Sequence, residues 1–209
     1  MALELIQDNQ MESRIITLSG LIDEQSVSEA LQRILCIIDT DVRNNERFKN
    51  YQYVPIQLYI NSCGGSVDSM WSLIDVIESS GTPIVTFCSG MCASAAAMIF
   101  LAGHYRFMYK HSSLMLHHMI VGNMGKIVDF TEDVAFFQHQ HERFMRFIKK
   151  HTNLSKKKIR RIDEKKEDLY LTAKECLKYG VCDSIIKKSS MREMMLQLHD
   201  ESTEIIDDM

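Results

Sequence analysis

The sequence of 209 residues predicts an α/β fold, because strand and helix patterns alternate along it. Short runs of alternating polarity rich in β-branched residues predict strands at Arg14–Leu18 and Ile56–Asn61. Apolar residues recur at helical spacing over Glu24–Ile38 and again in VDSMWSLIDVIESS. Two glycine-bearing turns, in SCGGS and SGMCAS, follow successive strands, at the kind of edge where open α/β sheets place ligands and chemistry.

The remaining elements follow from the same patterns. A third strand is predicted at Pro83–Cys88, followed by a helix in GMCASAAAMIFLAG, and RFMY and SLMLH predict two short strands. A long helix is expected from about Lys126 to Lys150. The polar, irregular stretch Asp39–Val54 is expected to be a surface loop, and the chain should end in a methionine-rich helix and an acidic tail.

The composition of the chain bears on whether it binds nucleic acid or a membrane. Apolar residues make up 45% and charged residues 25% of the chain, and the net charge is −4, so no global charge attracts nucleic acid or an anionic membrane. The basic run KKHTNLSKKKIRR is followed at once by acidic residues and predicts a solvated helix face. No apolar run approaches the ~18 residues that span a bilayer, and the first residues do not form a secretory signal. We therefore expect neither a nucleic-acid nor a membrane partner.

The cysteines do not have the spacing of a disulfide framework, which favours reduced thiols in a cytosol. They are Cys36, Cys63, Cys88, Cys92, Cys176 and Cys182. Cys88 and Cys92 lack a second pair at zinc-site spacing and are expected to be small buried side chains. The segment HQHE, with His139 and His141, lacks the i, i+4 histidine pair of a zincin and is expected on a solvated face, so no metal site is predicted.

A set of residues suited to acyl transfer is spread over four segments. Ser94 lies at a strand-to-helix turn, where free N–H groups and the helix dipole favour a developing anion. Gly64 and Gly65 form a turn that can present backbone N–H groups. His117 is a candidate base and Asp168 a candidate for orienting it, while His118 should point to the opposite face of the strand. Each residue alone is more often structural, and sequence spacing does not show that they meet.

Four segments, in the same order and at similar spacing over about 14–186, resemble the ClpP family of caseinolytic serine proteases. INSCGGSVDSMWSLIDVI resembles the family's INSPGG segment, and GMCASAAAMIFLAG resembles its G-x-A-A-S-M-A nucleophile helix. RFMYKHSSLMLHH resembles the family segment that ends in His-Gln, and EDLYLTAKECLKYGVCDSII resembles the segment that carries its aspartate. Four segments in register are a more specific signal than any one of them.

The resemblance implies a crotonase/ClpP-like fold, a repeated ββα superhelix with a protruding strand–helix handle. The implied domain is 14–188 with the handle at about 119–151, between a short segment 1–13 and a C-terminal helix and tail at 189–209. It implies Ser94 as nucleophile, His117 as base and Asp168 as its orienter. It also implies oxyanion donors at the backbone N–H groups of Gly65 and Ala95, and a substrate-binding strand containing Gly122 and Gly125.

The implied activity is that of a serine endopeptidase cutting unfolded polypeptide inside stacked heptameric rings. Its implied partners are copies of itself and an AAA+ unfoldase. No cofactor is expected; G-x-x-x-x-G-K-[ST] does not occur in the sequence, so ATP would be used by the unfoldase. The expected location is the cytoplasm, or the stroma or matrix of an organelle.

Several positions differ from the family pattern. Cys63 replaces the proline of its Pro-Gly-Gly turn, Ala95 replaces a methionine, and His118-Met119 replaces Gln-Pro. The segment before Asp168 is about two residues longer, which makes Asp163 the alternative orienter. The competing functions are a ring subunit that has lost activity, a crotonase-type acyl-CoA enzyme, and a signal-peptide-digesting protease with a lysine base. The presence of Ser94, His117 and Asp168 disfavours the first two, and the third usually has a membrane anchor.

Overall fold

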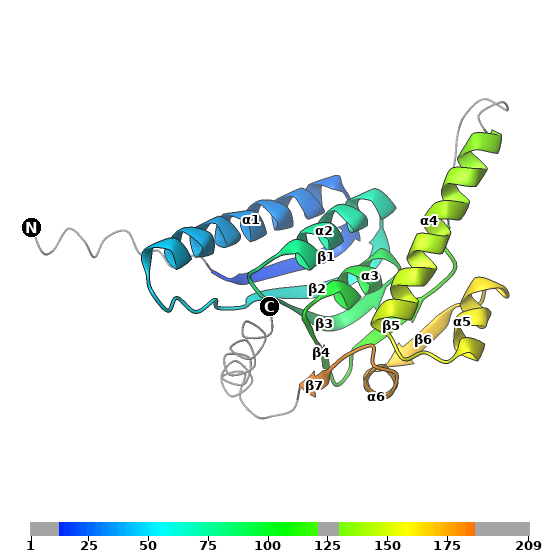
Figure 1. The fold of residues 1–209 in the computed structure, drawn as a ribbon. Coiled ribbons are helices and arrows are strands. Elements are labelled where there is room, and N and C mark those ends of the chain that lie inside the picture. Colours follow the sequence, from blue (N-terminus) through cyan, green and yellow to red (C-terminus); the bar gives the residue numbers. More distant parts are fainter. Residues whose placement is uncertain (1–12, 121–129, 187–209) are drawn as a thin grey trace, which may run out of the picture.

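The computed structural model describes residues 13–120 and 130–186, and its centre is a mostly parallel seven-stranded sheet (Figure 1). The strands are β1 (Ile15–Ile22), β2 (Ile56–Gly65), β3 (Ile84–Ala93), β4 (Tyr105–Tyr109), β5 (Ser113–Leu116), β6 (Leu169–Thr172) and β7 (Ser184–Ile186). Their order is β1-β2-β3-β4-β7, while β5 pairs with β3 and β6. Only the β5–β6 pairing is antiparallel. The α/β class predicted from the sequence is confirmed.

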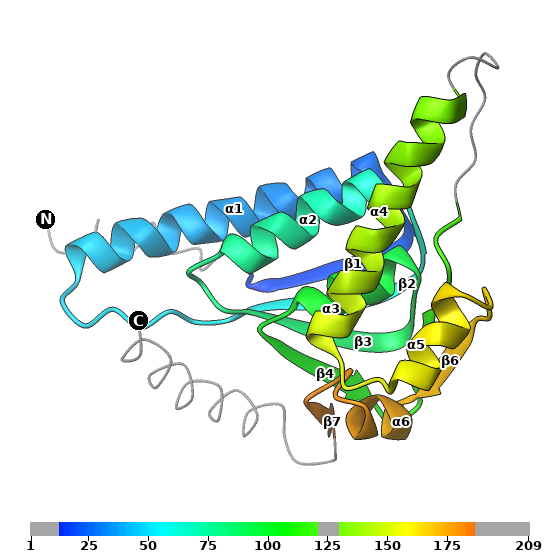
Figure 2. The same cartoon turned by 45° about the vertical axis from the view of Figure 1, so that its right-hand side comes forward.

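The helices of the described residues are α1 (Glu24–Arg47), α2 (Val67–Ser79), α3 (Ala95–Ala102), α4 (Phe130–His151), α5 (Lys156–Asp163) and α6 (Ala173–Lys178). The first three lie along one face of the sheet, and α4 crosses over α3 and extends beyond the sheet (Figure 2). Every residue of α3 is buried, because the sheet lies on one side of it and helices on the others. This arrangement explains why its sequence has no polar face.

The junction of α4 with α2 is aromatic and ionic. The rings of Trp71 and Phe147 meet edge to face with centroids 5.5 Å apart, and the guanidinium of Arg143 lies 3.8 Å from the centre of the Trp71 ring. An Arg over a tryptophan face is attracted by the ring quadrupole. The C-terminal half of α4 therefore packs against α2, the helix that follows Gly64 and Gly65.

Strands β2 and β3 run further than the sequence predicted. They were expected to end at Asn61 and Cys88, but β2 continues to Gly65 and β3 to Ala93. The register of β3 against β2 shifts between the pairs Ile60–Cys88 and Ser62–Cys92. Gly90 lies in this interval at φ +116°, beside the Asn61 side chain, whose oxygen accepts the Met91 N–H at 3.1 Å. The glycine thus forms an irregularity within the strand rather than its end. The second half of β3 leaves β4 and pairs with β5.

The prediction of a surface loop at Asp39–Val54 is wrong for Asp39–Arg47, because α1 continues to Arg47. The cause is tertiary. The Asp41 side chain is fully buried and accepts hydrogen bonds from Arg14, Tyr51 and Thr82. A buried carboxylate needs such partners, and residues distant in sequence supply them here.

Other expectations fall partly beyond the described residues. The predicted long helix is described as Phe130–His151. The segment 1–12, the residues 121–129 and the C-terminal helix and tail at 189–209 lie outside them. Within the residues that are described, no helix combines the length and apolar character needed to cross a membrane.

Candidate functional site

Ser94 lies between β3 and α3, in an uncommon backbone conformation. Its φ is +56° and its ψ −124°, a region that non-glycine residues rarely adopt. Its N–H donates to the Met115 carbonyl at 3.0 Å, and its own carbonyl accepts from Met98 N–H at 3.2 Å inside α3. These bonds fix the turn and direct the Ser94 side chain out of the helix start, beside strand β5.

His117 follows β5, the parallel neighbour of the second half of β3. Parallel strands end at the same sheet edge, so Ser94 and His117 come together, with Ser94 Oγ 2.7 Å from His117 Nε2. Burial lowers the pKa of His117, and the negative charge of Asp168 opposes that change. A lowered pKa keeps the imidazole neutral near pH 7, so Nε2 can accept the serine proton.

The two candidate aspartates have different partners. Strand β6 pairs antiparallel with β5, with Leu116 opposite Leu169, so one further step of that register sets Asp168 across from His117. Among the described residues, Asp168 acts on His117 through its charge, and no hydrogen bond joins them. Asp163 lies instead 3.0 Å from Nε2 of His141. Of the two aspartates, Asp168 is therefore the one set opposite His117 by the β5–β6 register.

The Gly64-Gly65 turn packs against the Ser94 turn so closely that only glycine fits. A Cβ on Gly64, where φ is +102°, would lie 2.7 Å from Ser94 Cβ and 2.8 Å from the Ala93 carbonyl oxygen. A Cβ on Gly65 would lie 2.1 Å from the Ile22 carbonyl oxygen. The absent side chains let two backbone turns meet beside one hydroxyl.

A cavity of about 150 Å³ opens at this junction. Its lining contains Gly65, Ser94, Ala95 and His117, the residues of the predicted site, together with mostly apolar side chains. The apolar part of the lining is Val67, Met70, Met119, Ile120 and Phe144. A concave apolar pocket with a few convergent polar groups is typical of a binding site.

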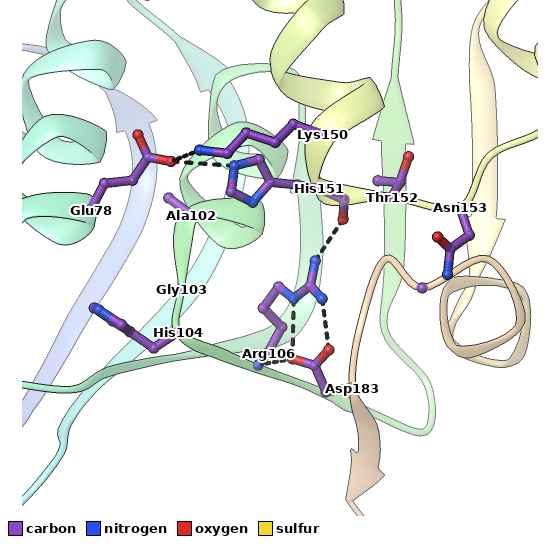
Figure 3. Close-up of a pocket in the computed structure, with 11 residues that line it drawn as sticks. Glu78, Ala102, Gly103, His104, Arg106, Lys150, His151, Thr152, Asn153 and Asp183 are labelled. Atoms are coloured by element: carbon purple, nitrogen blue, oxygen red, sulfur yellow. Dashed lines mark hydrogen bonds and ion pairs between the residues drawn. The ribbon is translucent and has the colours of Figure 1, made fainter. Parts of the chain in front are cut away.

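A larger cavity of about 700 Å³ lies elsewhere and shares no lining residue with the first. Figure 3 shows that its charged side chains pair with one another: Arg106 with Asp183, and Lys150 with Glu78. Arg106 also donates to the carbonyl oxygen of His151 at 2.7 Å. These contacts join the ends of α2 and α4 to the sheet, and the cavity contains no nucleophile–base pair.

None of the cysteines, all of which lie in the described residues, forms a disulfide. Cys88 and Cys92 are buried, as expected, and so are Cys176 and Cys182. Burial raises the pKa of Cys182 to about 12, so its thiolate does not form near neutral pH. Cys63, beside the glycine turn, is exposed. No group of His, Cys, Asp and Glu in the described part of the chain is arranged to hold a metal.

The structure corrects one expectation about the HQHE segment. His139 is exposed, but the side chain of His141 is only 15% exposed and its ring stacks on that of His118, with centroids 3.9 Å apart. His141 precedes Phe144 by three residues and Ile148 by seven, so it lies on the apolar stripe of α4. That spacing could have predicted its burial. Gly122 and Gly125 lie outside the described residues.

Comparison with known proteins identifies the family. The Clp protease family model matches residues 3–189. An ATP-dependent Clp protease proteolytic subunit of Porphyromonas gingivalis is 27% identical, over 86% of this chain and 76% of the relative. The proteolytic subunit 4 of Rhodococcus jostii is 29% identical over 84% and 86%, and the proteolytic subunit 1 of Rhodopirellula baltica is 26% identical over 86% and 74%. The chain therefore belongs to the Clp protease family and is a proteolytic subunit, a serine-type endopeptidase with the crotonase/ClpP-like fold.

Proposed function

We propose that Ser94, His117 and Asp168 hydrolyse peptide bonds through an acyl-enzyme. The observation that carries the proposal is the 2.7 Å approach of Ser94 Oγ to His117 Nε2 at the edge of a cavity. A nucleophile within hydrogen-bond reach of a neutral base is the signature of covalent acyl transfer. The charge of Asp168, facing the same imidazole, supports its role as the third member.

In the proposed reaction, His117 Nε2 takes the Ser94 proton as Oγ attacks the scissile carbonyl carbon. The imidazolium that forms is stabilised by the charge of Asp168, and it then gives the proton to the leaving amine as the C–N bond breaks. Water, activated by the same imidazole, cleaves the Ser94 ester and restores the hydroxyl. The balance of protons is complete without any cofactor.

The backbone N–H groups of Gly65 and Ala95 are proposed to bind the oxyanion. Both residues line the Ser94 cavity, and Ala95 is the first residue of α3, where N–H groups have no partner within the helix. Removing one donor of this kind typically costs about 3 kcal/mol of transition-state stabilisation. Glycine is needed at 65 to bring this donor against the end of β1, because a Cβ there would collide with the Ile22 carbonyl oxygen.

The adjoining pocket supports a preference for an apolar side chain on the substrate next to the cleaved bond. Its volume is about 150 Å³ and its lining includes Val67, Met70 and Phe144. An apolar cavity of roughly this size can hold a group the size of benzene. Gly122 and Gly125 are proposed, from the resemblance alone, to lie in the strand that binds the substrate backbone.

The proposed working form is a pair of stacked heptameric rings that receives unfolded polypeptide from an AAA+ unfoldase. The relatives are named as subunits of an ATP-dependent protease, which supports an energy-using partner. The sequence has no P-loop, so ATP would be hydrolysed by that partner. The scattered spacing of the cysteines supports a reducing compartment, such as the cytoplasm or an organelle stroma or matrix.

The first test is the intact mass of the purified protein after treatment with a fluorophosphonate. We expect one adduct per chain in the wild type and none in Ser94→Ala, because only an activated serine reacts and removing such a nucleophile typically lowers the rate by roughly 10⁶-fold. His117→Ala should also abolish labelling. Cleavage of a peptide with an apolar residue before the scissile bond is then measured on the same samples.

A matched control tests whether labelling reports an activated Ser94 and not merely an accessible serine. Ser89→Ala removes a nearby serine of β3 that does not line the Ser94 cavity, and it should leave labelling intact. Assembly is checked by mass measurement under native conditions. An assembled wild-type protein without an adduct would refute the proposed mechanism and favour the alternative, a ring subunit with a structural role.

A further inference from the structure

Next to the catalytic pair lies a second group of polar side chains that the proposed reaction does not use. It consists of His118, His141 and Asp163, which come from the end of β5, from α4 and from the end of α5. The imidazole rings of His118 and His141 stack with centroids 3.9 Å apart and planes 27° from parallel. Asp163 Oδ1 lies 3.0 Å from His141 Nε2. We call these three residues the histidine stack.

The tautomer of His141 follows from its surroundings. Its Nδ1 is buried and has no hydrogen-bond partner in the described part of the chain, whereas its Nε2 faces the Asp163 carboxylate. A buried N–H without an acceptor is costly, so the proton belongs on Nε2, which donates to Asp163. The His141 ring is thereby held in one orientation and forms a flat surface for the His118 ring.

The position of His118 ties this group to catalysis. It follows His117 directly, and the two side chains have different partners: His117 reaches Ser94, and His118 stacks on His141. Holding the His118 ring therefore fixes the backbone from which the His117 ring extends. Among the described residues, Asp168 acts on His117 through its charge. The hydrogen bond that also raises the pKa of the His117 imidazole is to the backbone of His118, so the ring is tied to the residue that the stack holds.

The third member closes the arrangement. Asp163 ends α5, which is anchored by the buried Ile159 and Ile162, and four residues then separate it from Asp168, which directly precedes β6. Strand β6 in turn pairs with β5, which His117 directly follows. The histidine stack thus joins α4 and α5 to the end of β5, next to which His117 and Asp168 lie.

We propose that His118, His141 and Asp163 are positioning residues that hold the backbone at His117 so that its imidazole stays in line with Ser94. The inference rests on the proposed function of Ser94 and His117. Since a misplacement of about 1 Å can cost about 100-fold in rate, loosening this strand end should slow acylation without changing how the reagent first binds.

The central experiment compares His118→Ala with His118→Phe. Fluorophosphonate labelling of Ser94 is followed over a range of reagent concentrations, which separates the maximal rate from the half-saturating concentration. We expect His118→Ala to lower the maximal rate by about 10- to 100-fold with little change in the half-saturating concentration. His118→Phe keeps a flat ring against His141 and should recover the rate to within about threefold.

The matched control is His139→Ala, an exposed histidine on the same helix, which should label like the wild type. If His118→Ala fails to fold, the half-exposed Asp163 supplies a second pair: Asp163→Ala should slow labelling, and Asp163→Asn, which keeps an acceptor oxygen, should not. Equal maximal rates for wild type and His118→Ala, or equal slowing in His118→Ala and His118→Phe, would overturn the proposal.

Hydrogen–deuterium exchange of peptides covering 113–120 gives a readout that needs no activity. Faster exchange in His118→Ala, but not in His139→Ala, is expected because the stack restrains this backbone. If the wild type is not labelled at all, the proposed function fails, and unchanged exchange in His118→Ala would then overturn the positioning role separately.

Discussion

The chemistry of single residues depends on how their neighbours hold and desolvate them. Ser94 is a small polar residue that could serve as an ordinary helix cap, but its φ of +56° and its 2.7 Å contact with His117 give it another use. His117 has a pKa below its usual value because burial disfavours the imidazolium, while Asp168 pulls in the other direction. The balance between these two influences sets the pH range in which His117 can accept a proton.

Asp168→Asn tests that balance. Removing the carboxylate charge takes away a contribution that raises the pKa of His117, so this pKa should fall further. The reaction needs the neutral imidazole, and therefore the acidic limb of the pH–rate profile should move to lower pH, while the maximal rate falls by about 100-fold or more. The measurement is the Ser94 labelling rate from pH 4.5 to 8.

The control for Asp168→Asn is Glu167→Gln, which removes one negative charge from the preceding residue, whose carboxylate pairs with Arg161. It should leave both the limb and the maximal rate close to the wild type. An acidic limb that stays in place in Asp168→Asn would show that Asp168 does not act on His117 in solution.

At the scale of elements, the site is made by two turns that meet at one edge of a parallel sheet. Strand β3 changes partners at its irregularity, so that its last residues lie beside β5 and deliver Ser94 next to His117. The end of β2 then packs its Gly64 against Ser94. The geometry of Ser94 therefore depends on a close contact with Gly64, about thirty positions earlier in the sequence.

Gly64→Ala should disturb that contact. Its Cβ would lie 2.7 Å from Ser94 Cβ, at a φ of +102° that is strained for alanine, so the Ser94 turn must shift. We expect labelling to slow by about 100-fold and the free energy of unfolding to fall by about 1–3 kcal/mol. Labelling kinetics and urea unfolding measure the two effects.

Gly20→Ala is the control that separates backbone strain at a positive φ from the clash of a new Cβ with a neighbouring residue. Gly20 also has a positive φ, +83°, but a Cβ there would meet nothing within 4 Å. This variant should lose some stability and label Ser94 at the wild-type rate. Equal labelling by both glycine variants would mean that contact between the two turns does not set the position of Ser94.

At the scale of the whole molecule, one buried carboxylate joins four segments far apart in sequence. Asp41 in α1 accepts bonds from Arg14 before β1, Tyr51 after the helix and Thr82 before β3, and Arg14 also donates to the Val54 carbonyl oxygen at 2.6 Å. The hydrogen bonds from Arg14, Tyr51 and Thr82 outweigh the opposing effect of burial, so the pKa of Asp41 lies below its usual value.

Asp41→Asn should destabilise the fold by about 3 kcal/mol at pH 7, since it leaves the Arg14 guanidinium without its charged partner. The pKa of Asp41 is lower in the folded state than its ordinary value of 3.8. Its carboxylate therefore stabilises the folded state at pH values above 3.8, and this stabilisation is lost as the pH falls through the lowered, folded-state pKa. The difference between variant and wild type should therefore shrink below about pH 4. Urea unfolding at several pH values measures it.

The control is Asp39→Asn, which removes an exposed acid that pairs with Arg43 on the same helix. Exposed i, i+4 pairs contribute only about 0.3–0.5 kcal/mol, so this variant should unfold nearly like the wild type at every pH. A pH-independent deficit in Asp41→Asn would contradict the ionised state of the buried group.

The sequence alone was enough to predict the α/β class and most elements, because these depend on local periodicity, and its side-chain chemistry pointed to Ser94 and His117, which the structure brings within 2.7 Å of each other. It did not determine the length of α1, since Asp39–Arg47 looks like a loop until Arg14, Tyr51 and Thr82 supply partners for Asp41. Nor did it predict that His141 stacks on His118, or that Asp163 contacts His141 and not His117. These contacts follow from tertiary packing, because the partners of buried polar groups are set by proximity in space, and spacing along the chain does not encode which of two nearby carboxylates reaches a given imidazole.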